Sequence, residues 1–193
     1  MWNYENYEST IEAVSQSDGG KKFIESDIKV YDFDKFTEDI CRDYRNKKNL
    51  CSVDAFAISD NGSFLFIEFK NARKSQFPKT SLPPKAFDSI YIAQFFLQEK
   101  YSIEYLKEHS VLIVVYNDDA VYGQQKENKS GHFEKIKNKL GTYAKVDKEK
   151  EILFNLEKYK GALYKDIFTI SKKEFMEKYA LKCNLISKPE GIF

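Results

Sequence analysis

The pattern of apolar and polar positions predicts a first helix after an irregular N-terminal segment. Residues 1–22 resemble an irregular or partly helical lead-in, with a break at the two glycines of 19–20. Either Asp32 or Asp34 is suited to cap a helix that continues to about Arg45. Apolar residues at helical spacing would form its buried side, namely Phe33, Phe36, Ile40 and Tyr44.

A hairpin is the strongest local prediction. Two runs rich in β-branched and aromatic residues, 52–58 and 64–70, flank the pair Asn61-Gly62, and an Asn-Gly pair in this setting indicates a hairpin turn. Side chains of a strand alternate between its two faces. Glu68 and Lys70 therefore share one face of the second strand, opposite Leu65, Ile67 and Phe69.

Two buried elements are expected after a polar segment, 72–84, that contains three prolines. A helix from about Lys85 to Gln98 would turn apolar side chains towards a core, namely Phe87, Ile90, Tyr91 and Phe95, with Ala93 and Leu97 as further candidates. Residues 111–116 form a continuous apolar run, as expected of a central strand that is covered on both faces.

The last third of the chain is less regular. Polarity rises from Asn117 to Lys150, which suggests an excursion with a short helix near 132–140. We then expect a helix around 149–159, a strand at 166–170 and a helix at 172–179 that opens with the capping-box pattern Ser171-x-x-Glu174.

This order predicts an α/β fold in which helices flank a mixed central sheet that contains the hairpin. The chain would form one domain, 1–193, with a core at 33–117 and a C-terminal α/β extension at 118–193.

Composition favours a folded protein in a reducing compartment. A hydrophobic fraction of 42% argues against disorder. No apolar run approaches the roughly 18 residues of a membrane span, and the N-terminal residues lack the pattern of a signal peptide. The three cysteines show no metal-ligand spacing, which favours free thiols. We therefore expect a cytoplasmic protein without a membrane partner.

Positive charge is concentrated after the hairpin, although the net charge is only +1. Between residues 70 and 85 there are five cations and no acid: Lys70, Arg73, Lys74, Lys79 and Lys85. Such a segment suits contact with a phosphate backbone. A solvated basic loop is the alternative interpretation.

The hairpin also predicts a chemical site, because it folds Asp54 back towards Glu68 and Lys70. Two carboxylates and a lysine on strands of core residues cost stability unless they hold something. A divalent metal ion beside a phosphate group fits these residue types. Alternatively, Glu68 and Lys70 are an exposed pair on an open sheet face, and Asp54 caps the end of a strand.

These elements resemble the PD-(D/E)XK, or restriction-endonuclease-like, nuclease superfamily over roughly residues 33–117. The matching features are Asp54 at the start of one strand and Glu68-Phe69-Lys70 in the next, followed by a helix and a buried strand. Two features depart from the pattern. No proline precedes Asp54, and the strand that usually pairs before the Asp-bearing one is not evident in 45–51; it is either displaced, for instance to 27–31, or absent.

The resemblance implies metal-dependent hydrolysis of phosphodiester bonds, with DNA favoured over RNA. Asp54, Glu68 and the Phe69 carbonyl would hold Mg²⁺ or Mn²⁺. Lys70 would position or help to deprotonate the attacking water, or stabilise developing charge. Homodimers are common among similar folds, so a homodimer is possible here too.

Two further residues are candidates by the same resemblance. The family often adds an acid from its first helix, for which Asp43 is favoured over Asp39 and Glu38, with ordinary solvated carboxylates as the alternative. Lys85 on the second helix would grip the scissile phosphate, or would form a surface ion pair with Asp88.

A different class of function is also compatible with the sequence. The same fold without catalysis would serve as a protein-binding module, for example an immunity or regulatory protein in bacterial competition or phage defence. The retention of Asp54, Glu68 and Lys70 together argues against this alternative.

Overall fold

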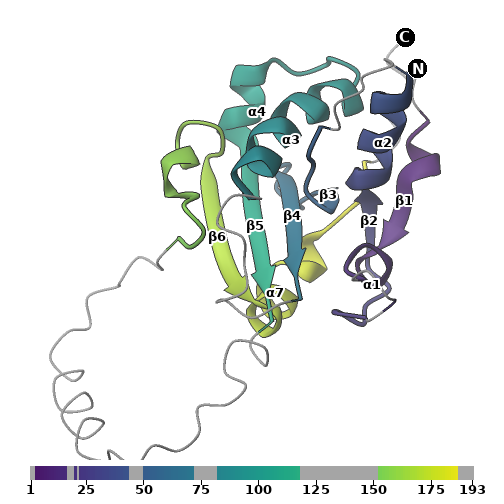
Figure 1. Ribbon diagram of the computed structural model, residues 1–193, viewed down its shortest axis with the longest axis vertical. Helices are drawn as coiled ribbons and strands as arrows, with labels where there is room; N and C mark the ends of the chain where they lie inside the picture. The colour runs from purple at the N-terminus through teal and green to yellow at the C-terminus, as the bar shows by residue number, and fades with distance from the viewer. Residues whose placement is uncertain are drawn as a thin grey trace, which may run out of the picture.

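The computed structural model describes residues 3–16, 20, 22–43, 50–71, 82–117 and 152–186, which build an α/β fold around one six-stranded sheet (Figure 1). The spatial order of the strands follows the chain order. The first four strands are antiparallel neighbours, and the last three run parallel. The predicted α/β class with a mixed sheet is therefore confirmed. The strands are β1 (Glu8–Thr10), β2 (Lys29–Asp32), β3 (Ala55–Ile58), β4 (Phe64–Lys70), β5 (Ser110–Tyr116) and β6 (Asp166–Ser171).

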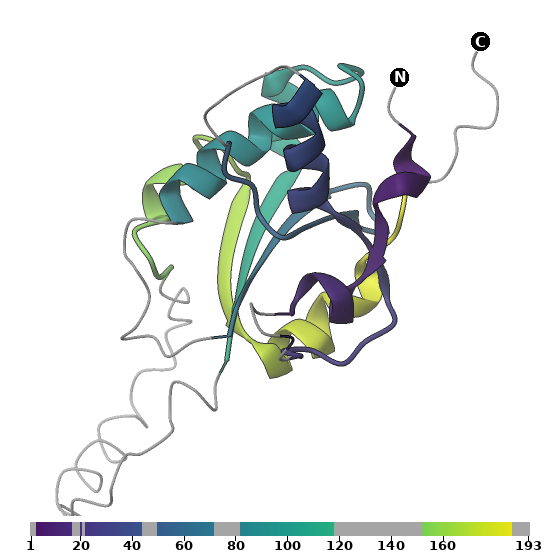
Figure 2. The same cartoon turned by 45° about the vertical axis from the view of Figure 1, so that its right-hand side comes forward.

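Helices cover both faces of the sheet (Figure 2). One face carries α2 (Phe33–Asp43), α3 (Leu82–Phe96) and α4 (Ile103–His109), and the other carries α1 (Ile11–Val14) and α7 (Lys172–Lys178). Short 3₁₀ helices complete the described part: η1 (Tyr4–Tyr7), η3 (Glu157–Tyr159) and η4 (Ala180–Lys182). The core beneath α2 and α3 is rich in aromatic rings that stack or meet edge to face, among them Phe33, Phe36, Phe56, Phe66 and Phe96. No helix of the described ranges has the length and apolarity that a membrane crossing requires.

The predicted hairpin is confirmed. β3 pairs antiparallel with β4, from Ala55 opposite Ile67 to Ile58 opposite Phe64. Gly62 in the turn has a φ of +80°, a backbone conformation that side-chain-bearing residues rarely adopt. Leu65, Ile67 and Phe69 pack beneath α7, while Phe64 and Phe66 pack on the opposite side of the sheet. Glu68 and Lys70 consequently project on the side of the sheet that α3 covers.

Of the two alternatives for the strand before Asp54, displacement to about 27–31 agrees with the structure, because β2 lies ahead of the first helix. β2 pairs antiparallel with β3, placing Tyr31 opposite Phe56 and Asp32 opposite Ala55. Asp32 also settles the capping question, because its Oδ1 accepts a hydrogen bond of 2.9 Å from the backbone N–H of Lys35. β1, which lies at the edge of the sheet next to β2, was not expected within the N-terminal lead-in.

The prediction for α3 is wrong about its start and about part of its buried side. Ile90, Ala93 and Leu97 are buried as predicted. The helix begins at Leu82, so Pro83 and Pro84 lie in its first turn, where a missing N–H costs nothing. Phe87, Tyr91 and Phe95 are 45%, 42% and 38% exposed. The helix is apolar nearly all round, so the pattern did not single out one side. The side that packs on the sheet carries smaller residues together with one aromatic: Leu82, Ala86, Ser89, Ile90, Ala93 and Phe96.

At the C-terminal end the strand and helix predictions hold, and one helix prediction fails. β6 pairs parallel with β5 in the same sheet, and Ser171 Oγ accepts a hydrogen bond of 3.1 Å from the Glu174 N–H at the start of α7. Within 152–159 only η3 is helical, because Phe154 and Asn155 adopt left-handed φ values of 67° and 59°. The excursion and short helix expected between 118 and 151 lie outside the described residues.

Candidate active site

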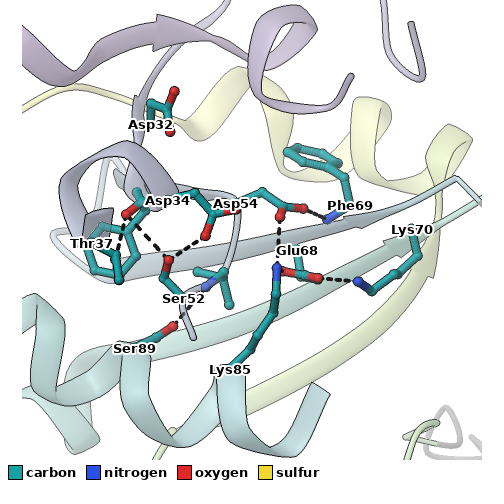
Figure 3. Close-up of polar contacts among 12 residues, drawn as sticks. Asp32, Asp34, Thr37, Ser52, Asp54, Glu68, Phe69, Lys70, Lys85 and Ser89 are labelled. Carbon is teal, nitrogen blue, oxygen red and sulfur yellow. Dashed lines mark hydrogen bonds and ion pairs between the residues drawn. The ribbon is translucent and has the colours of Figure 1, made fainter. Parts of the chain in front are cut away.

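Side chains from the hairpin and from α3 meet at one end of the sheet (Figure 3). The Nζ atom of Lys85 lies 3.1 Å from Asp54 Oδ1 and 3.0 Å from Glu68 Oε2. Lys70 Nζ forms an ion pair with the other carboxylate oxygen of Glu68, Oε1. The structure thus brings Asp54, Glu68 and Lys70 together, with Lys85 between the two acids.

Asp54 is held at a bend directly before β3. Its backbone carbonyl accepts a hydrogen bond of 3.1 Å from the Phe33 N–H, which extends the pairing with β2. Its side-chain Oδ2 accepts a hydrogen bond of 2.6 Å from the Phe69 N–H of β4. The carboxylate is therefore fixed by one oxygen and offers the other, Oδ1, to a cation. The N–H and C=O of one strand residue point towards the same neighbouring strand, so the Phe69 carbonyl faces this side as well.

Glu68 is fully buried, with a side-chain exposure of 0%. An isolated carboxylate in such a place is strongly disfavoured, and it persists only with charged or hydrogen-bonding partners. Lys70 and Lys85 supply two positive partners, one for each oxygen. The alternative interpretation, an exposed Glu68–Lys70 pair on an open sheet face, is wrong because α3 covers this position.

The environment changes the proton affinity of the cluster. Burial raises the pKa of the Asp54 carboxyl to about 7, and repulsion from Glu68 adds to the rise, against the opposing effects of Lys85, the Phe69 N–H and Lys70. Burial by itself would lower the pKa of Lys85, but attraction to Asp54 and Glu68 outweighs it and raises that pKa above its usual range. The two acids therefore favour the charged form of Lys85.

Helix α3 fixes both Lys85 and the segment that leads to Asp54. Ser89 Oγ accepts a hydrogen bond of 3.0 Å from the Val53 N–H, and Asp88 Oδ2 accepts one of 3.0 Å from the Cys51 N–H. Lys85 and Asp88 thus have different partners, so the alternative of a surface ion pair between them is wrong.

Asp34 is a member of this region that sequence reasoning considered only as a helix cap. Its Oδ1 accepts a hydrogen bond from Ser52 Oγ. Burial raises the pKa of Asp34, while the nearby charge of Lys85 lowers it. The pairing of β2 with β3 brings the first turn of α2 beside Asp54, and recognition of β2 in the sequence would have pointed to this acid.

The structure does not bring Asp43, the acid expected from the first helix, to the cluster. Asp43 is exposed and ends α2, nine residues after Asp34, which corresponds to about 14 Å along a helix. Its charge acts instead on Tyr7, whose pKa is raised chiefly by burial, then by the neighbouring Asp39, and also by Asp43.

Two cavities lie on either side of Lys85, and Asp34 lines both of them as well. A cavity of about 400 Å³ is lined by Asp54, Phe69 and Asn71, together with residues of the α1 region. A second cavity, of about 580 Å³, lies between α2 and the segment 50–52 and includes Thr37 and Arg42. A small group can therefore approach the cluster from either side of Lys85.

The residues of the cluster fit a hard divalent cation, although the described residues contain no ready-made group of three His, Cys, Asp or Glu ligands. Asp54 Oδ1 and Glu68 Oε2 already converge on one positive group, the Lys85 ammonium. Carboxylate and carbonyl oxygens are the ligands that Mg²⁺ and Mn²⁺ prefer. The two acids and the Phe69 carbonyl would hold the ion, with water completing its shell.

The predicted phosphate-binding residues Arg73, Lys74 and Lys79 lie outside the described residues.

Comparisons with protein-family models, with curated proteins and with solved structures find no significant match.

Proposed function

We propose that the chain is a metal-dependent nuclease that hydrolyses phosphodiester bonds, with DNA favoured over RNA. One observation supports the proposal above all: Asp54 and Glu68 converge on the ammonium group of Lys85, and Lys70 forms an ion pair with the other carboxylate oxygen of Glu68. The arrangement of β2, β3 and β4 followed by α3 and β5 is compatible with a restriction-endonuclease-like core, in which β2 takes the place of the strand expected before Asp54.

The roles of the residues follow from their surroundings. A bound Mg²⁺ or Mn²⁺ would lower the pKa of a coordinated water molecule and offset negative charge that develops on the phosphate. Glu68 anchors the site, because its burial and its two lysine partners fix its orientation. The Phe69 N–H orients Asp54 in the same way from the other side.

Lys70 is placed to act on the attacking water. Its side chain is 21% exposed, so its ammonium group contacts both Glu68 and the solvent side of the site. Hydrolysis adds hydroxide to phosphorus and a proton to the leaving oxygen. Lys70 would position the water or stabilise the negative charge of the transition state.

Cleavage assays with substitutions of the cluster test the proposal. Plasmid DNA, single-stranded DNA and RNA are incubated with the purified protein in Mg²⁺, Mn²⁺ or EDTA. We expect cleavage of at least one substrate, dependent on the metal ion. We expect Asp54→Asn, Glu68→Gln and Lys70→Met each to lower the rate by roughly 100-fold or more.

Matched substitutions on the surface serve as controls. Lys173 and Glu177 form an exposed pair on α7 with side-chain exposures of 81% and 59%. Lys173→Met and Glu177→Gln should leave the cleavage rate unchanged. Equal rates in the wild type and in all three site variants would trace the cleavage to a contaminant and exclude the proposed site.

A catalytically silent, protein-binding module is the second candidate, and one observation favours it. Phe87, Tyr91 and Phe95 form an exposed aromatic stripe along α3, and exposed aromatic side chains are enriched at protein interfaces. Absence of cleavage on every substrate, with tight binding to a protein partner that survives Glu68→Gln, would support this candidate.

A further inference from the structure

We propose that Lys85 is an internal counter-ion that occupies the cation position of the site, so that a divalent metal ion binds only by displacing its ammonium group. The inference rests on the proposed metal-dependent function and concerns how that same site is loaded. It assigns Lys85 a role in controlling metal affinity, in addition to any contact with substrate.

The geometry of the two acids carries the inference. A single nitrogen atom touches Asp54 Oδ1 and Glu68 Oε2 at 3.1 and 3.0 Å. These are the oxygens left for a shared cation, because Asp54 Oδ2 accepts from the Phe69 N–H and Glu68 Oε1 pairs with Lys70. Mg²⁺ holds its oxygen ligands at about 2.1 Å. The ion and the ammonium group therefore cannot share the space between these two oxygens.

When the Lys85 ammonium group is displaced, the adjacent cavities leave space for its side chain to adopt another position. It lines both cavities, together with Asp34. Asp34 is near enough for Lys85 to influence its ionisation, and a lysine side chain has four rotatable bonds with which to reach a new position. Asp34 or a substrate phosphate would then take the place of Asp54 and Glu68 as the partner of the ammonium group.

Lys70 provides an internal comparison, because it has the same charge but a different position. Its ammonium contacts Glu68 Oε1 and is not between the two acids. A metal ion at the shared position leaves this ion pair in place. Lys70 should therefore stabilise the protein both with and without metal, whereas Lys85 should do so only without metal.

Direct measurement of Mn²⁺ binding to the full chain tests the inference. When a competitor must leave before a ligand binds, the apparent dissociation constant equals the intrinsic one divided by the fraction of time that the site is vacant. Isothermal titration with Mn²⁺ should therefore give a dissociation constant about 5- to 150-fold lower for Lys85→Met than for the wild type, the range typical of coupled binding. An unchanged or weaker affinity would overturn the inference.

Thermal unfolding supplies a readout that is independent of activity. In EDTA we expect both Lys85→Met and Lys70→Met to melt below the wild type. Saturating Mn²⁺ should close the difference for Lys85→Met and leave it for Lys70→Met. A difference that persists for Lys85→Met in Mn²⁺ would contradict displacement. If Lys85→Met does not fold, Lys85→Gln removes the charge and retains a hydrogen-bond donor.

The outcome separates this inference from the nuclease proposal. Metal-dependent cleavage by a wild type whose Mn²⁺ affinity is not increased by Lys85→Met would retain the enzyme and reject the counter-ion. Tighter Mn²⁺ binding by Lys85→Met in a protein that cleaves no substrate would retain the counter-ion and reject the enzyme. No detectable Mn²⁺ binding by either protein would reject the counter-ion.

Discussion

Asp54 is the residue at which burial, repulsion and attraction oppose one another most directly. Burial and the neighbouring Glu68 favour its protonated form, while Lys85, the Phe69 N–H and Lys70 favour the ionised form. The balance raises its pKa to about 7, against about 3.9 in an unfolded chain. Folding of the metal-free protein is therefore linked to proton uptake at this carboxyl group.

The sign of that linkage gives a measurable dependence on pH. Between about pH 4 and pH 7 the folded state holds a proton on Asp54 that the unfolded state has lost. The contribution of Asp54 to stability is therefore fully present below about pH 4 and is lost as the pH rises to about 7, with a slope of at most about 1.4 kcal/mol per pH unit. Urea unfolding in EDTA at several pH values should show a smaller decline for Asp54→Asn than for the wild type.

The pH dependence of stability also involves Asp34, and Asp27, which is exposed, serves as a control. The pKa of Asp34 is also raised by burial, so part of the decline should remain in Asp54→Asn. Asp27 is exposed, and Asp27→Asn should retain the slope of the wild type. The same slope in Asp54→Asn and the wild type would show that Asp54 is ionised throughout this pH range.

At the scale of elements, α3 connects the packing of the sheet to the placement of the acids. Ser89 is completely buried, and its hydroxyl group accepts the hydrogen bond of the Val53 N–H next to Asp54. Ser89→Ala would leave this buried N–H without that partner, at a cost of about 1–3 kcal/mol in unfolding free energy. Chemical denaturation should reveal the loss.

A matched substitution distinguishes this loss from a general effect of removing a hydroxyl group. Ser63 lies partly exposed in the hairpin turn, and Ser63→Ala should change the unfolding free energy by less than about 0.5 kcal/mol. Equal stability of Ser89→Ala and the wild type would indicate that the segment before β3 does not depend on α3.

Elements whose signals are local could be predicted from the sequence. The hairpin and the shared face of Glu68 and Lys70 follow from a turn pair and a two-residue alternation. The buried side of α3 could not be chosen, because its apolar residues surround the helix and only contact with the sheet decides between Phe87 and Ala86. Asp34 was missed for a non-local reason, since its place depends on the pairing of β2 with β3.

At the scale of the whole molecule, a buried tyrosine joins the C-terminal part to the helix of the site. Tyr164 is fully buried beneath α3, and its hydroxyl group donates a hydrogen bond of 2.7 Å to the Ala86 carbonyl, next to Lys85. This contact joins residues 78 positions apart in the chain. The C-terminal segment thus contributes directly to the position of the N-terminal part of α3.

Tyr164→Phe should therefore lower stability across the molecule. Loss of one buried hydrogen bond costs about 1 kcal/mol, which corresponds to a fall of roughly 2–4 °C in melting temperature for a chain of this size. Tyr105 is 41% exposed, so Tyr105→Phe should have the same melting temperature as the wild type. Equal melting temperatures for Tyr164→Phe and the wild type would show that this hydrogen bond does not stabilise the fold.

The sequential order of the sheet has a consequence for how the molecule is made. Each strand pairs with the one synthesised before it, so no strand has to be inserted between two that are already joined. A nascent chain can extend the sheet one strand at a time, with β3 and β4 zipping locally. Asp54 and Glu68 would then come together before Lys85 is synthesised. Docking of α3 then brings Lys85 between them and offsets the repulsion of their charges.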